Sequence, residues 1–396
     1  MVKGGVVGWR KMWLVFINNL LYLNKIAVLL ILYVNFFAYK MALPCLHSMA
    51  MLDCQPCTGQ VICLQYLYCH MNKQYPIWQL MAESLQQGIA VMLLYVLQSN
   101  GSSPGRQGFC MAVNAKGQME GSIGGGIMEH KFVEMARQQL AVDSTKLAEA
   151  SVRKQVHDKA AGKNQSGMIC SGEQTIVLYP LKQADIPTVE NIIACLQTNK
   201  NGLLQLSPTG LQFTETVPNI DFYFEMQQED NWLYQEKIGY KNRLYIIGGG
   251  HCSLAFAELM GRMDFYISLY DDRENLNTFL QNGFAHEKHI VTDYTELKNK
   301  IPPGSNHYVV LMTFGYRTDS IALKALLGKQ FKYLGMLGSK KKIEKLFADY
   351  KSEGLDERLL QNIFSPIGLH IKSQTPEEIA ISIAAEIIKV KNQYLP

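Results

Sequence analysis

From residue 244 onward, short apolar segments alternate with helix-forming segments, and this alternation constrains the possible folds more than any other feature. Leu244–Ile247 predicts a buried strand, and His251–Met260 predicts the helix that follows it. Further strands are predicted at 265–270, 307–312 and 331–335. Because strand–helix alternation implies a parallel sheet covered by helices, residues 244–396 are expected to form a doubly wound α/β domain.

The first turn of this region carries the spacing Gly248-x-Gly250-x-x-Ser253, with serine where a dinucleotide fingerprint usually has glycine or alanine. Asp271 follows at the end of the next predicted strand, where an acid can meet a ribose hydroxyl. His251 could donate to a phosphate or act as an acid or base; alternatively it is an ordinary first residue of a helix. The pattern predicts a nucleotide-binding topology but does not establish nicotinamide chemistry.

The first half of the chain holds two glycine-rich loops, at Gly101–Gly108 and Gly121–Glu129, on either side of a predicted strand and turn. Successive backbone N–H groups in such turns form concavities that bind anions. The second loop leads into a predicted helix, so its N–H groups are expected at a helix N-terminus, where the macrodipole favours negative charge. The alternative is a pair of tight hairpin turns without a ligand.

Several side chains near these loops are candidates for binding a phosphorylated ligand. Arg106 could pair with a phosphate, and Glu129 could bind a cationic or N–H-rich edge; a solvated cation and a helix-capping charge are the alternatives. Cys170 could be a soft metal ligand or a sulfur carrier, or simply a small buried apolar residue. The candidates in this half are Ser102, Ser103, Arg106, Gly124, Gly125, Gly126, Glu129 and Cys170.

The remaining pattern of the first half predicts an α+β domain over residues 71–236, followed by a polar linker at 237–243. Helices are expected at 77–85 and 187–198, with strands at 89–97, 109–113 and 175–179 and short strands up to about 236. Residues 141–168 are polar and are expected to be irregular or exposed.

Residues 1–70 do not show the helix and strand patterns of the rest of the chain. The stretch 12–39 is apolar and long enough for a bilayer, but Asn18, Asn24 and Lys25 interrupt it. It is either a membrane segment or a non-native extension, in which case Met71 begins the functional protein. Cys54 and Cys57 have zinc-like spacing without a matching second pair, so a metal site there is not expected.

Composition narrows the function class. A formal net charge of +4 over 396 residues argues against a dedicated nucleic-acid binder. The longest basic run, Lys340–Lys342, is expected on a solvated helix face. Nine cysteines without regular spacing do not form a disulfide framework, which favours a reducing, cytoplasmic location.

Together these motifs resemble the xanthine dehydrogenase accessory factor family of the XdhC/CoxI type, from about Ile77 to Lys389. The similar segments are Gly101–Gly108, Gly121–Glu129, Ile247–His251, Asp271–Arg273, Tyr333–Ser339 and Pro366–Leu369 with Thr375–Ala380. The resemblance implies an N-terminal α+β domain of the XdhC/CoxI type and a C-terminal Rossmann-like domain. Residues 1–70 have no counterpart in it.

The resemblance implies a chaperone that binds molybdenum cofactor, in its mono- or dinucleotide form, more than a catalyst. Such a protein supports sulfuration of the cofactor with a cysteine desulfurase and delivers it to an apo molybdenum hydroxylase of the xanthine or CO dehydrogenase type. A homodimer is expected. Cys170 would approach the molybdenum, and the second domain could bind NAD(P) or another nucleotide.

This sequence departs from the family pattern at two places. The family's Cys-Gly-Gly appears as Cys170-Ser171-Gly172, and its Thr-His appears as Thr313-Phe314. The phenylalanine removes a polar group and puts a catalytic role there in doubt. An NAD(P)-dependent oxidoreductase that uses the C-terminal domain is the alternative function, although His251 is the one clear proton donor that the sequence offers it.

Overall fold

A computed structural model describes residues 72–141, 149–156, 172–217 and 219–393 of the chain. The described residues all belong to a unit that spans Leu64–Pro396. The apolar stretch at 12–39, the Cys54–Cys57 pair, Met71 and Cys170 lie outside the described residues. Among the helices in the described part, none is both long and apolar enough to span a membrane.

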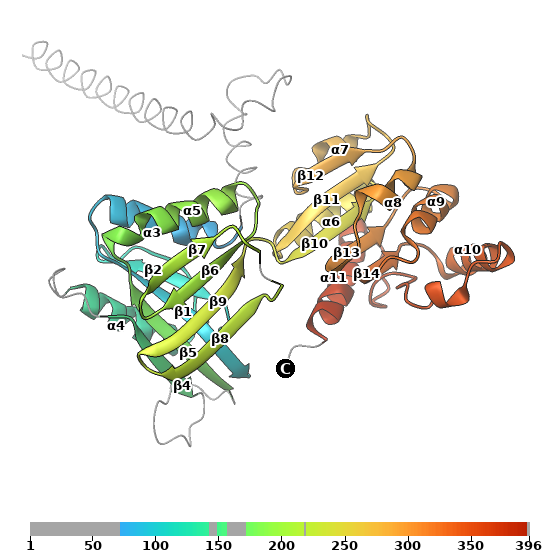
Figure 1. The fold of residues 1–396 in the computed structure, drawn as a ribbon. Helices are drawn as coiled ribbons and strands as arrows, with labels where there is room; N and C mark the ends of the chain where they lie inside the picture. Colours follow the sequence, from blue (N-terminus) through green and yellow to red (C-terminus); the bar gives the residue numbers. More distant parts are fainter. Residues whose placement is uncertain (1–71, 142–148, 157–171, 218, 394–396) are drawn as a thin grey trace, which may run out of the picture. The chain divides into compact units, whose positions relative to one another are not determined.

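The first sheet is antiparallel, with the strand order β3-β2-β1-β5-β4 (Figure 1). Its strands are β1 (Val91–Gly101), β2 (Cys110–Asn114), β3 (Met119–Gly121), β4 (Ser151–Val156) and β5 (Gly172–Pro180). A second antiparallel sheet has the order β7-β6-β9-β8. Its strands are β6 (Gly202–Ser207), β7 (Gly210–Thr214), β8 (Phe222–Gln228) and β9 (Asn231–Ile238). These sheets and the helices α3 (Tyr75–Gln86), α4 (Gly126–Leu140) and α5 (Ile186–Gln197) confirm the α+β prediction.

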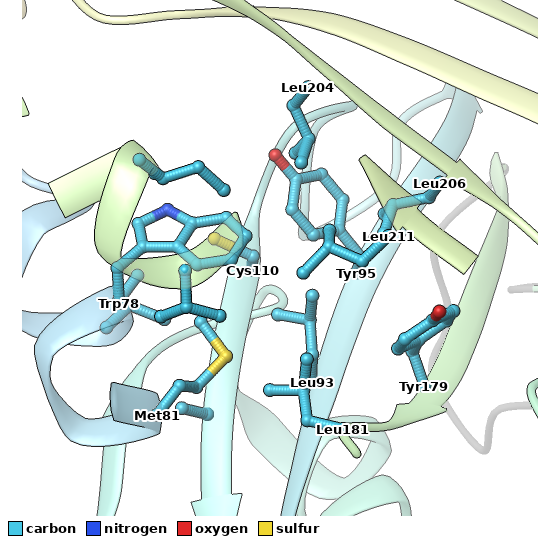
Figure 2. Packing of buried hydrophobic residues seen from close by; sticks show 14 of the residues in the cluster. Trp78, Met81, Leu93, Tyr95, Cys110, Tyr179, Leu181, Leu204, Leu206 and Leu211 are labelled. Atoms are coloured by element: carbon cyan, nitrogen blue, oxygen red, sulfur yellow. The ribbon is translucent and has the colours of Figure 1, made fainter. Parts of the chain in front are cut away.

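Strand β1 lies at the centre of this domain because its apolar run is buried on both faces. Leu93 and Tyr95 point into a core shared with Trp78 of α3 and Leu204 of β6 (Figure 2). Met92, Leu94 and Val96 point to the opposite face, which α4 covers. Alternate side chains of a strand face opposite sides of its sheet, so one strand supplies both cores.

The irregular segment expected at 141–168 contains a strand, β4, so that expectation is wrong for 151–156. Val152 is the one buried side chain of β4, which pairs along its length with β5 at the edge of the sheet. An edge strand held by backbone hydrogen bonds needs little apolar patterning, and this explains why a polar sequence concealed it.

The C-terminal sheet is parallel, with the order β12-β11-β10-β13-β14, which confirms the doubly wound prediction. Its strands are β10 (Asn242–Ile247), β11 (Phe265–Asp271), β12 (Glu287–Ile290), β13 (Gly304–Leu311) and β14 (Phe331–Met336). One face packs against α6 (His251–Gly261), α7 (Asn277–Gln281) and α11 (Pro376–Asn392). The other packs against α8 (Leu297–Lys300), α9 (Tyr316–Leu326) and α10 (Lys340–Ser352).

Element ends refine the sequence boundaries. Strand β9 continues to Ile238 and β10 begins at Asn242. Of the polar linker expected at 237–243, residues 239–241 alone therefore lie outside a strand. Helix α11 begins with a capping box, in which Thr375 and Glu378 each accept a hydrogen bond from the other's backbone N–H.

Candidate functional site

The two glycine loops of the first domain touch backbone to backbone. A methyl group on Gly105 would lie 2.0 Å from the carbonyl oxygen of Ile123, and one on Gly124 would lie 2.4 Å from the Gly105 nitrogen. Gln174 of β5, which is 1% exposed, donates its side-chain amide to the Gly105 carbonyl at 2.8 Å and to the Ile123 carbonyl at 3.4 Å. The two loops therefore form one unit, fixed against the sheet.

The donors of the second loop bind the carboxylate of Glu129, a side chain of the helix that follows. One carboxylate oxygen of Glu129 accepts hydrogen bonds from the N–H groups of Ile123 and Gly125, each at 2.9 Å, and from the Ser122 hydroxyl at 2.6 Å. Gly125 is the N-cap of α4. Glu129 thus makes the contacts of a helix-capping charge, and these two N–H groups are engaged within the protein.

The first loop presents the groups that remain accessible. Arg106 is exposed and donates through Nη1 to the Gly101 carbonyl at 2.9 Å, which leaves its other N–H groups facing solvent. Ser102 is exposed, and its hydroxyl has no partner among the described residues, whereas Ser103 is buried and donates to the Gly105 carbonyl at 3.3 Å. The exposed Gly126 begins α4. Arg106, Ser102 and the start of α4 are the accessible donors here.

Strand β5 begins against the first loop. Gly172 pairs with Gly101, and a methyl group on Gly172 would lie 2.6 Å from the backbone of Ser102. Cys170 precedes Gly172 by two positions in the sequence and lies outside the described residues.

A buried acid lies behind the first loop. Glu236 of β9 is 1% exposed and accepts hydrogen bonds from the hydroxyls of Tyr95 at 2.5 Å and Tyr234 at 2.7 Å. Lys241 donates to its other oxygen at 2.7 Å. A methyl group on Gly108 would approach that oxygen to 3.0 Å, so this cluster adjoins the end of the loop. Burial and the nearby Glu236 charge raise the pKa of the Cys110 thiol, which disfavours a reactive thiolate there.

In the C-terminal domain, the glycine turn after β10 is packed tightly on one side and open on the other. Gly248 has a φ of +108°, and a methyl group on it would lie 2.4 Å from the Met312 carbonyl oxygen. Gly249 accepts a hydrogen bond from Thr278 of α7 at 2.5 Å. A methyl group on Gly250 would meet nothing within 4 Å, and His251 is exposed at the start of α6. Ser253 is buried, as a fingerprint position between helix and sheet requires.

Asp271 is fully buried and binds within the protein. Its carboxylate accepts from the Gly249 N–H at 2.6 Å and from the Arg273 guanidinium at 2.8 and 2.9 Å. Burial disfavours the ionised form, but the hydrogen bonds from Arg273 and Gly249 outweigh it and hold the pKa of Asp271 below its usual value. The acid expected to meet a ribose thus positions the glycine turn and Arg273.

Replacing Asp271 with asparagine should destabilise the C-terminal domain by about 2 kcal/mol at pH 7, because it breaks a buried ion pair whose arginine is partly solvated. A depressed pKa contributes stability above the unfolded value of about 3.9, and that contribution is lost as pH falls through the folded value. Circular dichroism melts from pH 7 to pH 2 should show the difference between wild type and variant shrinking below about pH 4. A difference that stays constant over this range would contradict the assignment.

The C-terminal domain contains a second buried acid–base pair, which the sequence did not indicate. Asp319 of α9 is fully buried and accepts a hydrogen bond from Lys342 of α10. It also accepts from the Thr313 hydroxyl at 2.6 Å and the Thr313 N–H at 3.2 Å. Burial raises the pKa of Asp319, although the hydrogen bonds from Lys342 and Thr313 oppose the shift. The expectation that Lys340–Lys342 lies on a solvated helix face is therefore wrong for Lys342. No local spacing in the sequence links Lys342 to Asp319.

The described residues contain no cluster of three or more histidine, cysteine or acidic side chains placed to hold a metal ion. At the glycine loops of the first domain and the glycine turn of the second, the accessible groups described above are N–H donors, a hydroxyl, the Arg106 cation and His251. These groups suit an anionic organic ligand.

An α+β domain with paired glycine loops, followed by a Rossmann-type domain, defines the class of protein. Residues 84–150 match the XdhC and CoxI family, and residues 244–387 match the XdhC Rossmann domain. The first match contains both glycine loops, and the second contains Gly248–Ser253 and Asp271. The matches together cover more than half of the chain, and the chain belongs to the XdhC and CoxI family.

Two related proteins show low sequence identity to this chain. The chain is 23% identical over 308 residues to YqeB of Escherichia coli K12, described as uncharacterised, covering 78% of this chain and 44% of that protein. It is 25% identical over 162 residues to a probable xanthine dehydrogenase subunit of Bacillus subtilis 168, covering 41% and 46% of the two chains. The aligned part thus spans less than half the length of each relative.

A crystal structure described as a xanthine dehydrogenase from Bacillus halodurans has the same fold. The TM-score is 0.56 at 21% identity, and the match covers 79% of this chain and 95% of the other.

Proposed function

We propose that this protein is an accessory factor in the maturation of a xanthine dehydrogenase-type molybdenum hydroxylase. Membership of the XdhC and CoxI family supports this role, as does similarity to a protein named as part of a xanthine dehydrogenase. It would bind molybdenum cofactor, support sulfuration of the cofactor with a cysteine desulfurase and deliver it to the apo enzyme. The protein would act in the cytoplasm as a homodimer.

The two glycine loops, which contact each other beside the start of β5, support the proposal most directly. Arg106, the Ser102 hydroxyl and the start of α4 are accessible donors for the phosphate of the pterin. The N–H groups of Ile123 and Gly125 take no part, because Glu129 engages them. Cys170, two positions before Gly172, would meet the molybdenum end or carry its sulfur, since thiolates suit soft metals and persulfide chemistry.

In the C-terminal domain, a nucleotide would place its phosphate at Gly250 and His251, where the glycine turn is open. Asp271 would act as a positioning residue, because its oxygens already hold Gly249 and Arg273. The ligand would be NAD(P), another nucleotide or the dinucleotide form of the cofactor.

Replacing Cys170 with alanine should lower activation of the apo hydroxylase by about tenfold in a reconstitution with cofactor and cysteine desulfurase, on the scale of one lost metal-directed contact. Cys195→Ala, which removes a buried thiol on α5, should leave activation within about twofold once folding is matched. Transfer by Cys170→Ala equal to that of wild type would remove Cys170 from the scheme. Mass spectrometry of the protein purified from cofactor-producing cells tests the whole proposal: bound NAD(P) without any pterin would favour the dehydrogenase alternative.

A further inference from the structure

Phe314 is the most exposed large apolar side chain in the described part of the protein, at 70%. It lies in the turn after β13, at the carboxyl end of a central strand of the parallel sheet. Leaving an aromatic ring in water forgoes the stabilisation that burial would give it. Its position is therefore informative, because ligands of doubly wound sheets bind outside the carboxyl ends of the strands.

The turn that carries Phe314 touches the glycine turn directly. A methyl group on Gly248 would lie 2.4 Å from the Met312 carbonyl oxygen and 2.8 Å from the Thr313 nitrogen. Strand β10 stands between β11 and β13, so these two turns meet where the order of strands reverses. This is the switch point at which a crevice forms in such sheets.

The residue before Phe314 is held by a buried polar cluster. The Thr313 hydroxyl lies 2.7 Å from that of Thr318 and donates to Asp319 at 2.6 Å. Asp319 is itself fully buried and held by Lys342. The exposed ring thus stands on a turn whose backbone is fixed by a buried polar cluster, which lowers the entropy lost when a ligand binds.

A second planar group lies beside the ring. The guanidinium carbon of Arg273 is 4.9 Å from the centre of the Phe314 ring. Two hydrogen bonds to Asp271 hold that guanidinium in place, and Asp271 also binds the N–H of Gly249. Phenyl and guanidinium planes are both surfaces on which flat heteroaromatic rings stack.

We propose that Phe314 and Arg273 form a stacking platform for the flat heteroaromatic ring of a phosphorylated ligand whose phosphate lies at the start of α6. The purine of a nucleotide and the pterin of a molybdenum cofactor share this chemistry. The inference rests on the proposed nucleotide site of the C-terminal domain and is independent of the role in enzyme maturation. Phe314 then determines specificity for the ring, and the glycine turn determines affinity for the phosphate.

The test measures binding of three probes to the full-length protein by calorimetry: ADP, a pterin monophosphate and ribose 5-phosphate. Phe314→Ala should weaken binding of the ring-bearing probes about tenfold, as expected for one lost stacking contact, and leave ribose 5-phosphate unchanged. Phe314→Trp should retain wild-type affinity, and Phe314→Leu should not. The stronger of the two ring-bearing probes identifies the source of the ring. Because Phe314 is exposed, these substitutions should leave the melting temperature unchanged.

Ile371→Ala provides the control, since it removes another exposed apolar side chain of the same domain, 52% exposed, that is not one of the two platform residues. If Phe314→Ala binds ADP and the pterin probe as tightly as wild type, the platform is overturned and the phosphate site stands. If the wild-type protein binds none of the three probes, both the platform and the nucleotide site are overturned.

Discussion

Gly105→Ala should lower the free energy of unfolding of the N-terminal domain by about 3 kcal/mol or more, on the scale of severe overpacking. The added methyl group would lie 2.0 Å from the Ile123 carbonyl oxygen and 2.6 Å from the Gln174 amide. The Ile123 carbonyl belongs to the backbone and cannot rotate away as a side chain can. The two loops must therefore separate to make room for the methyl group. Urea unfolding followed by tryptophan fluorescence distinguishes this domain, which contains Trp78 and Trp232, from residues 244–396, which contain no tryptophan.

Gly250→Ala is the matched control, and its urea unfolding is followed by circular dichroism because its domain contains no tryptophan. Gly250 also has an ordinary φ, −72°, but a methyl group there meets nothing within 4 Å. Because Gly250 is the N-cap of α6, where alanine is less favourable than glycine, its replacement should cost no more than about 1 kcal/mol. Equal stability of Gly105→Ala and wild type would mean that the two loops are not in backbone contact.

Glu236→Ala should cost about 4 kcal/mol of unfolding free energy in the same domain. It leaves the hydroxyls of Tyr95 and Tyr234 buried without their acceptor, and Lys241 without its carboxylate. Glu236→Gln keeps an acceptor of the same shape and should cost less, about 2 kcal/mol. The denaturant midpoint, read from the same fluorescence, measures both.

The neighbouring strand supplies the control for Glu236. Glu225 accepts a hydrogen bond from Tyr223 with the same two-residue spacing, but the pair is exposed. Glu225→Ala should change stability by no more than about 0.5 kcal/mol. Similar costs at the two glutamates would show that burial does not set the strength of this cluster.

Elements with a strong local signal could be predicted from the sequence. The capping box of α11 and the glycine turn between β10 and α6 were predictable because neighbouring residues specify them. Strand β12 was not predicted, because Glu287–Ile290 has no buried side chain and is held by its parallel pairing with β11. Long-range pairing leaves little trace in the residues that take part.

The candidate sites were likewise predictable only in part. The sequence located the glycine loops and Asp271, but not the partners that engage Glu129 and Asp271 inside the protein. Asp271 was assigned to a ligand, and Glu129 either to a ligand or to a helix cap, because their backbone partners arise from the folded loop and carry no residue signature. Phe314 was noted only as a departure from a family pattern, because its exposure and its contact with Arg273 arise from the fold.

The double burial of β1 has a thermodynamic consequence. Its even-numbered residues from Met92 to Val96 belong to the core under α4, while Leu93 and Tyr95 belong to the core shared with the second sheet. Neither core can open while the other keeps this strand in place. The first glycine loop follows β1 directly and the second is packed against the first, so both are coupled to the cooperative unfolding of the whole domain.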